Sequence, residues 1–232
     1  MNLQPPIQKT VSQVCKILDQ NYPNSNLGNK RNPLDEYLYI ILSLRTHAPG
    51  FTTSYKVFKS RFRSWREAER ASVEEIEEAI ISGGLASQKA KRIKVALQHI
   101  RRELGELSLR RLKSMPQEQV EAFLTELPGI GLKSARCIMM YSLGFQVLPV
   151  DTHVARISRR LGWVDAYSYR KLHDELEHIM PSSLRYSFHI YCVQHGRAVC
   201  RGQYPRCDIC CLSKYCNQVG VGRKGTLRTS IN

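Results

Sequence analysis

The sequence predicts an all-α protein, on three observations. Apolar residues recur three and four positions apart in one segment after another, alternating strand patterns are nearly absent, and there is no repeat of fixed period. The 232 residues include 42% hydrophobic and 24% charged residues, a balance typical of globular proteins that bury one large core or two small ones. This composition excludes a wholly disordered chain.

The first two predicted helices have clear starts. Residues 10–20 carry one apolar helix face with the spacing i, i+3, i+4 and i+7: Val11, Val14, Cys15 and Leu18. The next helix begins at Asn32-Pro33, because proline suits the first helical position. Asp35 and Glu36 in its first turn interact favourably with the positive end of the helix dipole.

A capping box predicts the start of a further helix at Ser72. The Ser72 hydroxyl and the Glu75 carboxylate can accept from each other's backbone N–H groups, ahead of an apolar face that begins at Ile76. Gly83-Gly84 then ends this helix. The other predicted helices cover about the following ranges: 87–104, 116–126, 133–143, 152–161, 169–179 and 184–199.

The charge balance points to a polyanionic partner. The chain carries 35 Lys and Arg against 20 Asp and Glu, a formal charge of +15. Cations that neutralise phosphates release counterions, so nucleic acid is the partner we expect, with an anionic membrane surface as the alternative. Each basic run by itself is also typical of a solvated helix face, as in the run Lys89, Lys91, Arg92 and Lys94.

The sequence also bears on membrane association, export and the order of the C-terminal segment. No apolar run approaches the roughly 18 to 20 residues that span a bilayer, and the start MNLQPPIQKT lacks the pattern of a secretory signal. We therefore expect a cytoplasmic protein with no membrane association. Residues 218–232 are rich in glycine and basic residues and poor in large apolar ones, which predicts a flexible basic tail.

Four of the eight cysteines form a compact loop with the spacing C-x6-C-x2-C-x5-C: Cys200, Cys207, Cys210 and Cys216. Disulfides are disfavoured in a reducing compartment. The spacing leaves zinc and an iron–sulfur cluster equally open, because it matches neither the paired zinc pattern nor the ferredoxin run. Arg201 and Arg206 inside the loop can neutralise a cluster's charge or point to phosphate. Cys211 is a spare, and Cys15, Cys137 and Cys192 fall on apolar helix faces and are expected in the core.

A glycine turn between two predicted helices suits phosphate binding. In Leu127-Pro-Gly-Ile-Gly-Leu-Lys133, Gly129 and Gly131 let the backbone approach a ligand, and the N–H groups that open the next helix, at Lys133 and Ser134, suit a phosphate. The segment resembles a helix–hairpin–helix DNA-binding element. The alternative is an ordinary connection between two helices.

Asp151 follows Lys133 by eighteen residues, in Val150-Asp-Thr-His153. It is a candidate N-cap of the helix that starts there. It is also a candidate carboxylate near the mouth of the hairpin, since a lysine and an aspartate at two helix starts can face one cleft.

At this point the sequence resembles the helix–hairpin–helix DNA glycosylase superfamily, and its endonuclease III family in particular. The resemblance covers about residues 30 to 217 and is carried by four motifs in this order: LPGIGLKSA (127–135), VDTH (150–153), HGR (195–197) and the cysteine loop. It implies a [4Fe–4S] cluster on the four loop cysteines, which decides between zinc and iron–sulfur.

The resemblance also implies the domain organisation. Residues 33–145 would form a six-helix barrel with the helix–hairpin–helix at about 120–143, and residues 1–32 with 146–217 would form the cluster domain. Lys133 and Asp151 would then lie on the walls of a DNA-binding cleft between them. A cytoplasmic, nucleoid-associated enzyme of bacterial or archaeal type follows, acting as a monomer on double-stranded DNA.

The Lys133 amine and the Asp151 carboxylate each suit one step of base removal. A neutral Lys133 amine can attack C1′ of a deoxynucleotide, displace the base and form a Schiff base that permits β-elimination of the 3′ phosphate. Neighbouring cations and a helix N-terminus favour the neutral amine. Asp151 would stabilise the positive charge that develops on the sugar and help to move protons.

Two loop residues are candidates for filling the gap left by an extruded base. Leu85, in Gly84-Leu-Ala-Ser-Gln-Lys-Ala90, matches the family's intercalating leucine. Arg45 stands where endonuclease III commonly has a glutamine that probes the opposite strand, and its guanidinium can donate to a base edge or a phosphate there. Their alternatives are a loop hydrophobe and a surface charge. The segment 47–50 lacks an aspartate often found there, and Cys137, where some 8-oxoguanine glycosylases carry a cysteine, is predicted to be a small buried residue.

The resulting functional prediction is a bifunctional DNA glycosylase and abasic-site lyase that removes oxidised pyrimidines of the thymine glycol type from duplex DNA. The alternatives are a relative with another lesion preference, such as mismatches or 8-oxoguanine, or an enzyme with lyase activity alone. Lys133 argues against a monofunctional mismatch glycosylase, because that branch commonly has a non-nucleophilic residue at this position. A non-catalytic DNA-binding iron–sulfur module is the alternative from another class.

Overall fold

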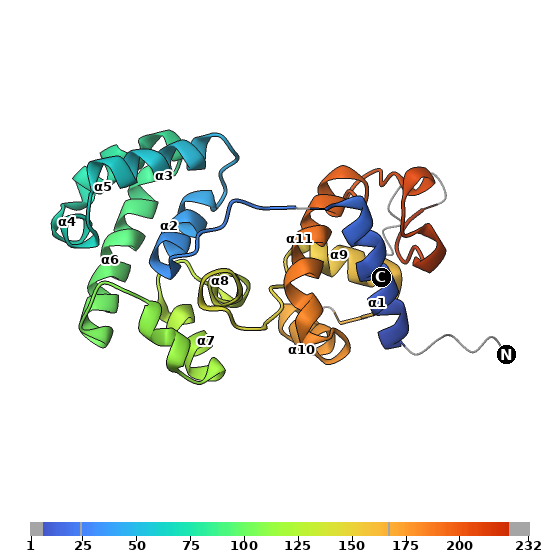
Figure 1. Ribbon diagram of the computed structural model, residues 1–232. Helices are drawn as coiled ribbons and strands as arrows, with labels where there is room; N and C mark the ends of the chain where they lie inside the picture. Colours follow the sequence, from blue (N-terminus) through green and yellow to red (C-terminus); the bar gives the residue numbers. More distant parts are fainter. Residues whose placement is uncertain (1–6, 24, 167, 223–232) are drawn as a thin grey trace. The chain divides into compact units, whose positions relative to one another are not determined.

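The computed structural model describes residues 7–23, 25–166 and 168–222, and every regular element in these ranges is helical (Figure 1). This confirms the all-α prediction. Of the predicted tail, residues 223–232 lie outside the described residues. Within the described ranges, no helix combines the length and the apolar character needed to cross a membrane.

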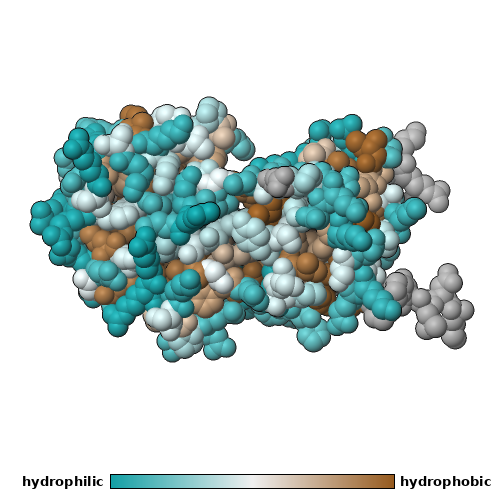
Figure 2. All heavy atoms as spheres, viewed as in Figure 1, coloured by the Kyte–Doolittle hydropathy of each residue, from teal (hydrophilic) through white to brown (hydrophobic). Residues whose placement is uncertain are grey.

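The chain divides into two compact units. The first, here called the hairpin unit, comprises residues 28–145, and the second, here called the cysteine unit, comprises residues 1–27 and 146–232. Figure 2 shows hydrophilic side chains over most of the visible face of each unit, as expected when the apolar side chains pack inside.

The hairpin unit is built around one largely buried helix, α2. The α-helices of this unit, in chain order, are α2 (Pro33–Ser43), α3 (Gly50–Arg61), α4 (Trp65–Arg70), α5 (Val73–Ile80), α6 (Ala86–Leu104), α7 (Gln117–Glu126) and α8 (Leu132–Ile138). Helix α2 contacts α3, α6 and α8, and its apolar residues face neighbours on nearly every side. Asn32 caps it with its side-chain oxygen, and Pro33 follows at the first position, as the sequence predicted.

Short turns of other helix types complete this unit: η1 (Ile81–Gly83), η2 (Arg110–Ser114) and the π-helical η3 (Met139–Leu143), which continues α8. The capping box of Ser72 and Glu75 is present at the start of α5. Helices α3 and α4 were not predicted. No side chain caps α3, and only Ser54 and Phe58 of this helix are buried, so its sequence carries little of the apolar periodicity.

The cysteine unit packs four helices around a second core. They are α1 (Ile7–Asn21), α9 (Thr152–Leu161), α10 (Tyr169–Ile179) and α11 (Ser182–Ala198), followed by the turns η4 (Cys207–Ile209) and η5 (Ser213–Tyr215). Helix α11 lies against both α1 and α9, so the start of the chain packs on its last third (Figure 1). The cysteine loop follows α11, and Cys200, Cys210 and Cys216 pack partly buried against this core.

Candidate active site and cysteine loop

The turn between α7 and α8 requires glycine at its first position. Gly129 has a φ of +87°, and a Cβ there would lie 3.0 Å from Ile41 Cδ1 and 3.1 Å from Arg92 Cδ. The Tyr37 hydroxyl reaches the Pro128 carbonyl oxygen at 3.4 Å from buried α2, which ties the turn to the core. The hairpin backbone is therefore held in place by the side chains of α2 and α6 that pack against it.

Gly131 opens α8 in an extended conformation, and its carbonyl accepts the first helical hydrogen bond, from Ala135 N at 2.9 Å. No side chain caps this helix. Arg136 in α8 donates through Nε to Glu121 Oε2 in α7 at 2.8 Å, and the Arg136 side chain is only 8% exposed. This charged hydrogen bond holds the two helices of the hairpin together.

Lys133 lies exposed in the first turn of α8, and Ser134 beside it is buried. A buried acid stands in the same unit within electrostatic reach of this lysine. Burial raises the pKa of the fully buried Glu36 carboxyl, while hydrogen bonds from Lys30 N and the Asn29 amide, and then the Lys30 and Lys133 charges, lower it. The sequence predicts Glu36 only as a residue of a helix first turn, because its burial depends on how residues 28–32 fold over α2.

Asp151 caps α9. Its Oδ1 accepts from His153 N at 2.9 Å and from Val154 N at 2.8 Å, and the residue is partly buried. The predicted N-cap is thereby confirmed. The second oxygen, Oδ2, takes no part in these two bonds. Lys133 belongs to the hairpin unit and Asp151 to the cysteine unit.

The VDTH and HGR motifs meet through Arg156. Its Nη2 donates to His153 Nδ1 at 3.0 Å and to the Gly196 carbonyl at 3.1 Å, and its Nε donates to the Cys200 carbonyl at 2.9 Å. A Cβ on Gly196 would lie 2.3 Å from His153 Nδ1, so this close approach needs glycine. Burial lowers the pKa of His153, the Asp151 charge opposes this, and the Arg156 and Arg197 charges lower the pKa further.

The two predicted gap-filling residues share an unusual backbone conformation. Arg45 and Leu85 each have a φ of +52°, in the left-handed region, and each is exposed. Their loops touch directly, because the Thr46 hydroxyl donates to the Gly83 carbonyl at 2.6 Å. The structure therefore brings Arg45 and Leu85 onto two loops with a common hydrogen bond.

None of the eight cysteines forms a disulfide, and the four of the predicted cluster are partly buried. Arg160, a nearly buried residue of α9, donates through Nη1 to Cys200 Sγ at 3.2 Å and to the Arg201 carbonyl at 2.7 Å. His195 lies 3.5 Å from Cys210 Sγ through Nε2. Arg201 and Arg206 are exposed in the same loop, and Cys15, Cys137 and Cys192 are buried, as predicted.

Four thiols within one loop are chemically suited to bind an iron–sulfur cluster. Within the described residues, no three His, Cys, Asp or Glu side chains converge on a point that could hold one ion. In a [4Fe–4S] cluster, each of four cysteine thiolates would bind a different iron. Burial raises the pKa of Cys207, Cys210 and Cys216, and Cys200 raises each further by its charge. These thiols are close enough to repel one another as thiolates, and coordinated iron would offset that repulsion.

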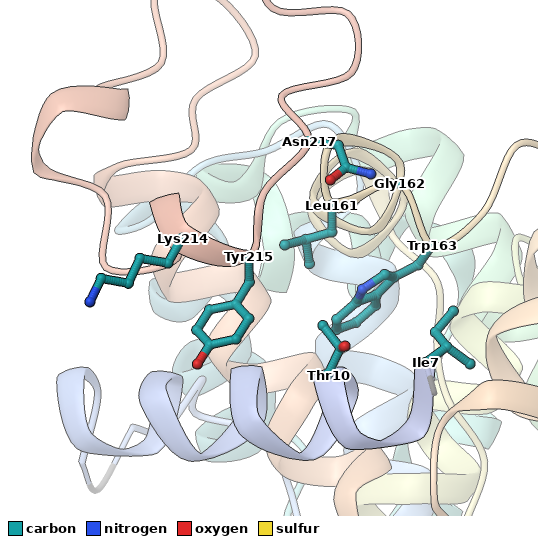
Figure 3. A pocket seen from close by; sticks show the side chains of 8 residues that line it. All are labelled: Ile7, Thr10, Leu161, Gly162, Trp163, Lys214, Tyr215 and Asn217. Atoms are coloured by element: carbon teal, nitrogen blue, oxygen red, sulfur yellow. The ribbon is translucent and has the colours of Figure 1, made fainter. Parts of the chain in front are cut away.

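A pocket of about 380 Å³ lies beside the cysteine loop (Figure 3). It is lined by residues from α1, from the end of α9 and from η5 and beyond: Ile7, Thr10, Leu161, Gly162, Trp163, Lys214, Tyr215 and Asn217. In Figure 3 the Tyr215 hydroxyl points toward α1. None of the predicted catalytic, DNA-binding or cysteine residues lines it, so this pocket is not the candidate active site.

Comparison with known proteins places the chain in a family. Residues 38–182 match the model of the HhH-GPD superfamily of base excision DNA repair proteins. A putative DNA glycosylase of Arabidopsis thaliana is 32% identical over 173 residues, which are 74% of this chain and 59% of that protein's length. Endonuclease III of Synechocystis sp. is 30% identical over 215 residues, 90% of this chain and 92% of that protein.

Solved structures show the same fold. Endonuclease III in a non-covalent complex with DNA matches with a TM-score of 0.78 at 24% identity, over 91% of this chain and 95% of that chain. A thermostable thymine-DNA glycosylase matches with a TM-score of 0.77 at 19% identity, over 90% and 96%. By the family model and the Synechocystis relative, the chain belongs to the HhH-GPD superfamily of base excision DNA repair proteins and is an endonuclease III-like DNA glycosylase within it.

Proposed function

We propose that the protein removes oxidised pyrimidines of the thymine glycol type from duplex DNA and then cleaves the strand at the abasic site. The observation that carries the proposal is an exposed amine, Lys133, one residue inside a helix that follows a sterically fixed glycine hairpin, in a chain of the endonuclease III family. An amine on a rigid element keeps its position relative to bound DNA, which nucleophilic attack requires.

The reaction would proceed through Lys133. Its neutral Nζ attacks C1′, the C1′–N bond breaks, and the base leaves with the bonding electron pair and takes up a proton. The sugar ring then opens to a Schiff base, loss of a C2′ proton follows, and the C3′–O bond breaks to release the 3′ phosphate. Asp151 would stabilise the positive charge that develops at the sugar and relay protons through its carboxylate.

In this proposal, three parts of the protein would contact the DNA. The backbone at Gly129 and Gly131, with Ser134 in the first helical turn, would receive phosphates of the damaged strand. Arg45 and Leu85 would enter the duplex where the damaged base has left it. Arg201 and Arg206, both exposed in the cysteine loop, would contact phosphates farther along.

The four loop cysteines, Cys200, Cys207, Cys210 and Cys216, would hold a [4Fe–4S] cluster. The cluster supplies electron-transfer capacity in general, and here we assign it the structural role of ordering the loop that carries Arg201 and Arg206. The Arg160 contacts to Cys200 Sγ and to the Arg201 carbonyl support this role, because one guanidinium holds both a ligand and the basic loop. Elemental analysis should find about four irons per chain and no zinc.

Borohydride trapping tests the nucleophile. Purified protein is reduced with borohydride on two duplexes, one with thymine glycol and one with an abasic site, beside Lys133→Gln and the control Lys113→Gln, another exposed lysine of the hairpin unit. Covalent adducts are expected on both duplexes with wild type and Lys113→Gln and on neither with Lys133→Gln. An adduct on the abasic duplex alone would refute the thymine glycol assignment, and no adduct on either would refute the lysine mechanism.

A further inference from the structure

Lys89 is a buried cation whose hydrogen bonds go to uncharged oxygens. The residue is 1% exposed, and its Nζ donates to the Leu42 carbonyl at 2.7 Å, to Thr46 Oγ1 at 2.7 Å and to the Gly83 carbonyl at 2.9 Å. The three N–H groups of the ammonium are thereby used. Burial lowers the pKa of Lys89, and the nearby Arg92 guanidinium lowers it further, so holding this charge is costly.

The three acceptors belong to the loops that carry the gap-filling residues. Leu42 lies in the last turn of α2, where its carbonyl lacks a helical partner, and Thr46 directly follows Arg45. Gly83 ends η1, two residues before Leu85. One side chain therefore holds the loop of Arg45 and the loop of Leu85 at a single point.

The backbone on both loops needs such support. Arg45 and Leu85 adopt left-handed φ angles that residues with a Cβ disfavour, and these persist only where the surroundings impose them. The direct Thr46–Gly83 hydrogen bond runs beside the Lys89 contacts. Tight packing completes the junction, because a Cβ on Gly83 would lie 2.6 Å from the Oγ of the buried Ser54.

The Lys89 ammonium can donate hydrogen bonds to both loops, which an apolar side chain cannot do. A methionine of similar length would fill the same space at lower desolvation cost. It would remove the Lys89 donor from the Leu42 carbonyl and from Thr46 Oγ1, and it would leave the Gly83 carbonyl with the Thr46 hydroxyl alone. The ammonium sits at the negative end of the α2 dipole and fixes the direction of each acceptor. Directional bonds set the spacing of the two loops, whereas apolar packing alone would set only their contact.

We propose that Lys89 is a positioning residue that fixes Arg45 and Leu85 at one mutual spacing, so that both side chains enter the duplex together as the damaged base leaves it. The inference rests on the proposed function, in which these two residues fill the gap. If both side chains are already ordered, their ordering adds no entropic cost to base extrusion. The base therefore leaves a paired duplex faster than it would if the two loops were mobile.

Lys89→Met is the test variant and Lys94→Met its matched control. Lys94 lies on the same helix and also donates to backbone carbonyls, those of Glu69 and Ala71, but it touches neither loop. Single-turnover excision is measured on thymine glycol in a fully paired duplex and on the same lesion inside a bubble of mismatches, where little duplex has to be opened. Lys89→Met should slow excision from the paired duplex by about tenfold and from the bubble by less than about twofold. Lys94→Met should leave the ratio of the two rates unchanged.

Two outcomes overturn the proposal. Equal slowing on both substrates would mean that Lys89 serves only general stability, and unchanged rates on both would mean that it positions nothing. Thr46→Val, which removes the hydroxyl between Lys89 and Gly83 but keeps its shape, provides a second variant if Lys89→Met does not fold. It should change the ratio in the same direction.

Hydrogen exchange makes the result independent of the proposed activity. In Lys89→Met, amides of residues 44–50 and 81–85 should exchange faster together, and in Lys94→Met neither segment should change. Unchanged exchange in either segment of Lys89→Met overturns the proposal even if the enzyme is active. Wild-type protein without excision on either substrate would instead refute the proposed function, and with it the gap-filling role assigned here.

Discussion

Asp151 combines a helix cap with a proposed catalytic charge, and two substitutions separate these roles. Its Oδ1 accepts from His153 N and Val154 N, and the Val154 side chain is fully buried. Asp151→Ala removes this acceptor and leaves the two N–H groups, of His153 and Val154, unsatisfied near the core. Loss of an N-cap costs about 0.5–2 kcal/mol, and the buried setting puts this one near the upper end, at about 2 kcal/mol.

Asp151→Asn keeps the side-chain oxygen and loses the charge. The cap survives, and only the interaction of the carboxylate with the helix dipole is lost, about 0.3–1 kcal/mol. Excision should nevertheless fall in both variants by about 10²- to 10⁴-fold, because neither side chain can stabilise developing positive charge or carry a proton. The expected pattern is one activity defect shared by two variants that differ in stability by about 1 kcal/mol.

Urea unfolding and single-turnover excision measured on the same preparations check both parts. An Asp151→Asn enzyme within about threefold of wild-type activity would refute the catalytic role of the carboxylate. Equal stability of the Ala and Asn variants would refute the contribution of the cap. A loss of activity in the Ala variant alone would mean that the helix start, and not the charge, is what catalysis requires.

Further predictions concern pH, salt and backbone. Because burial lowers the pKa of His153 below its ordinary 6.5, the unfolded chain binds this proton more readily, and the free energy of unfolding should decrease as the pH falls below about 6.5. Urea titrations of His153→Gln, which keeps a hydrogen-bond acceptor, should show a smaller decrease, and an identical pH dependence would contradict this. Replacing Arg201 and Arg206 together by Ala should reduce the slope of log affinity for DNA against log salt by about 1.8, since each contacted phosphate contributes about 0.9; an unchanged slope in fluorescence anisotropy would exclude both contacts. Gly129→Ala should lower the free energy of unfolding by about 1–2 kcal/mol, because a Cβ is strained at a φ of +87° and meets Ile41 at 3.0 Å. A thermal midpoint equal to that of wild type would show that the turn adapts.

The sequence alone was sufficient for the fold class and for most helix ends. The capping box of Ser72, the Asn32-Pro33 start and the Asp151 cap are local signals, and each is present in the structure. Local signals succeed because a cap or a proline acts within one helical turn of itself. The glycine turn at Gly129 and the buried Cys137 were also predicted from the sequence, whereas the positive φ of Gly129 is known only from the structure.

Only the tertiary structure decided the roles of the basic residues. In the sequence, Lys89 and Lys94 belong to a basic run typical of a solvated helix face, yet one is buried and the other donates to two backbone carbonyls. Arg160 likewise reaches the cysteine loop, which lies 40 residues farther along the chain. Helical periodicity reports which residues share a face, but the oxygens that meet a long cationic side chain are set by the packing of distant segments. The residues proposed for the chemistry can therefore be named from the sequence, whereas the contacts that hold them in place depend on how distant loops pack together in the fold.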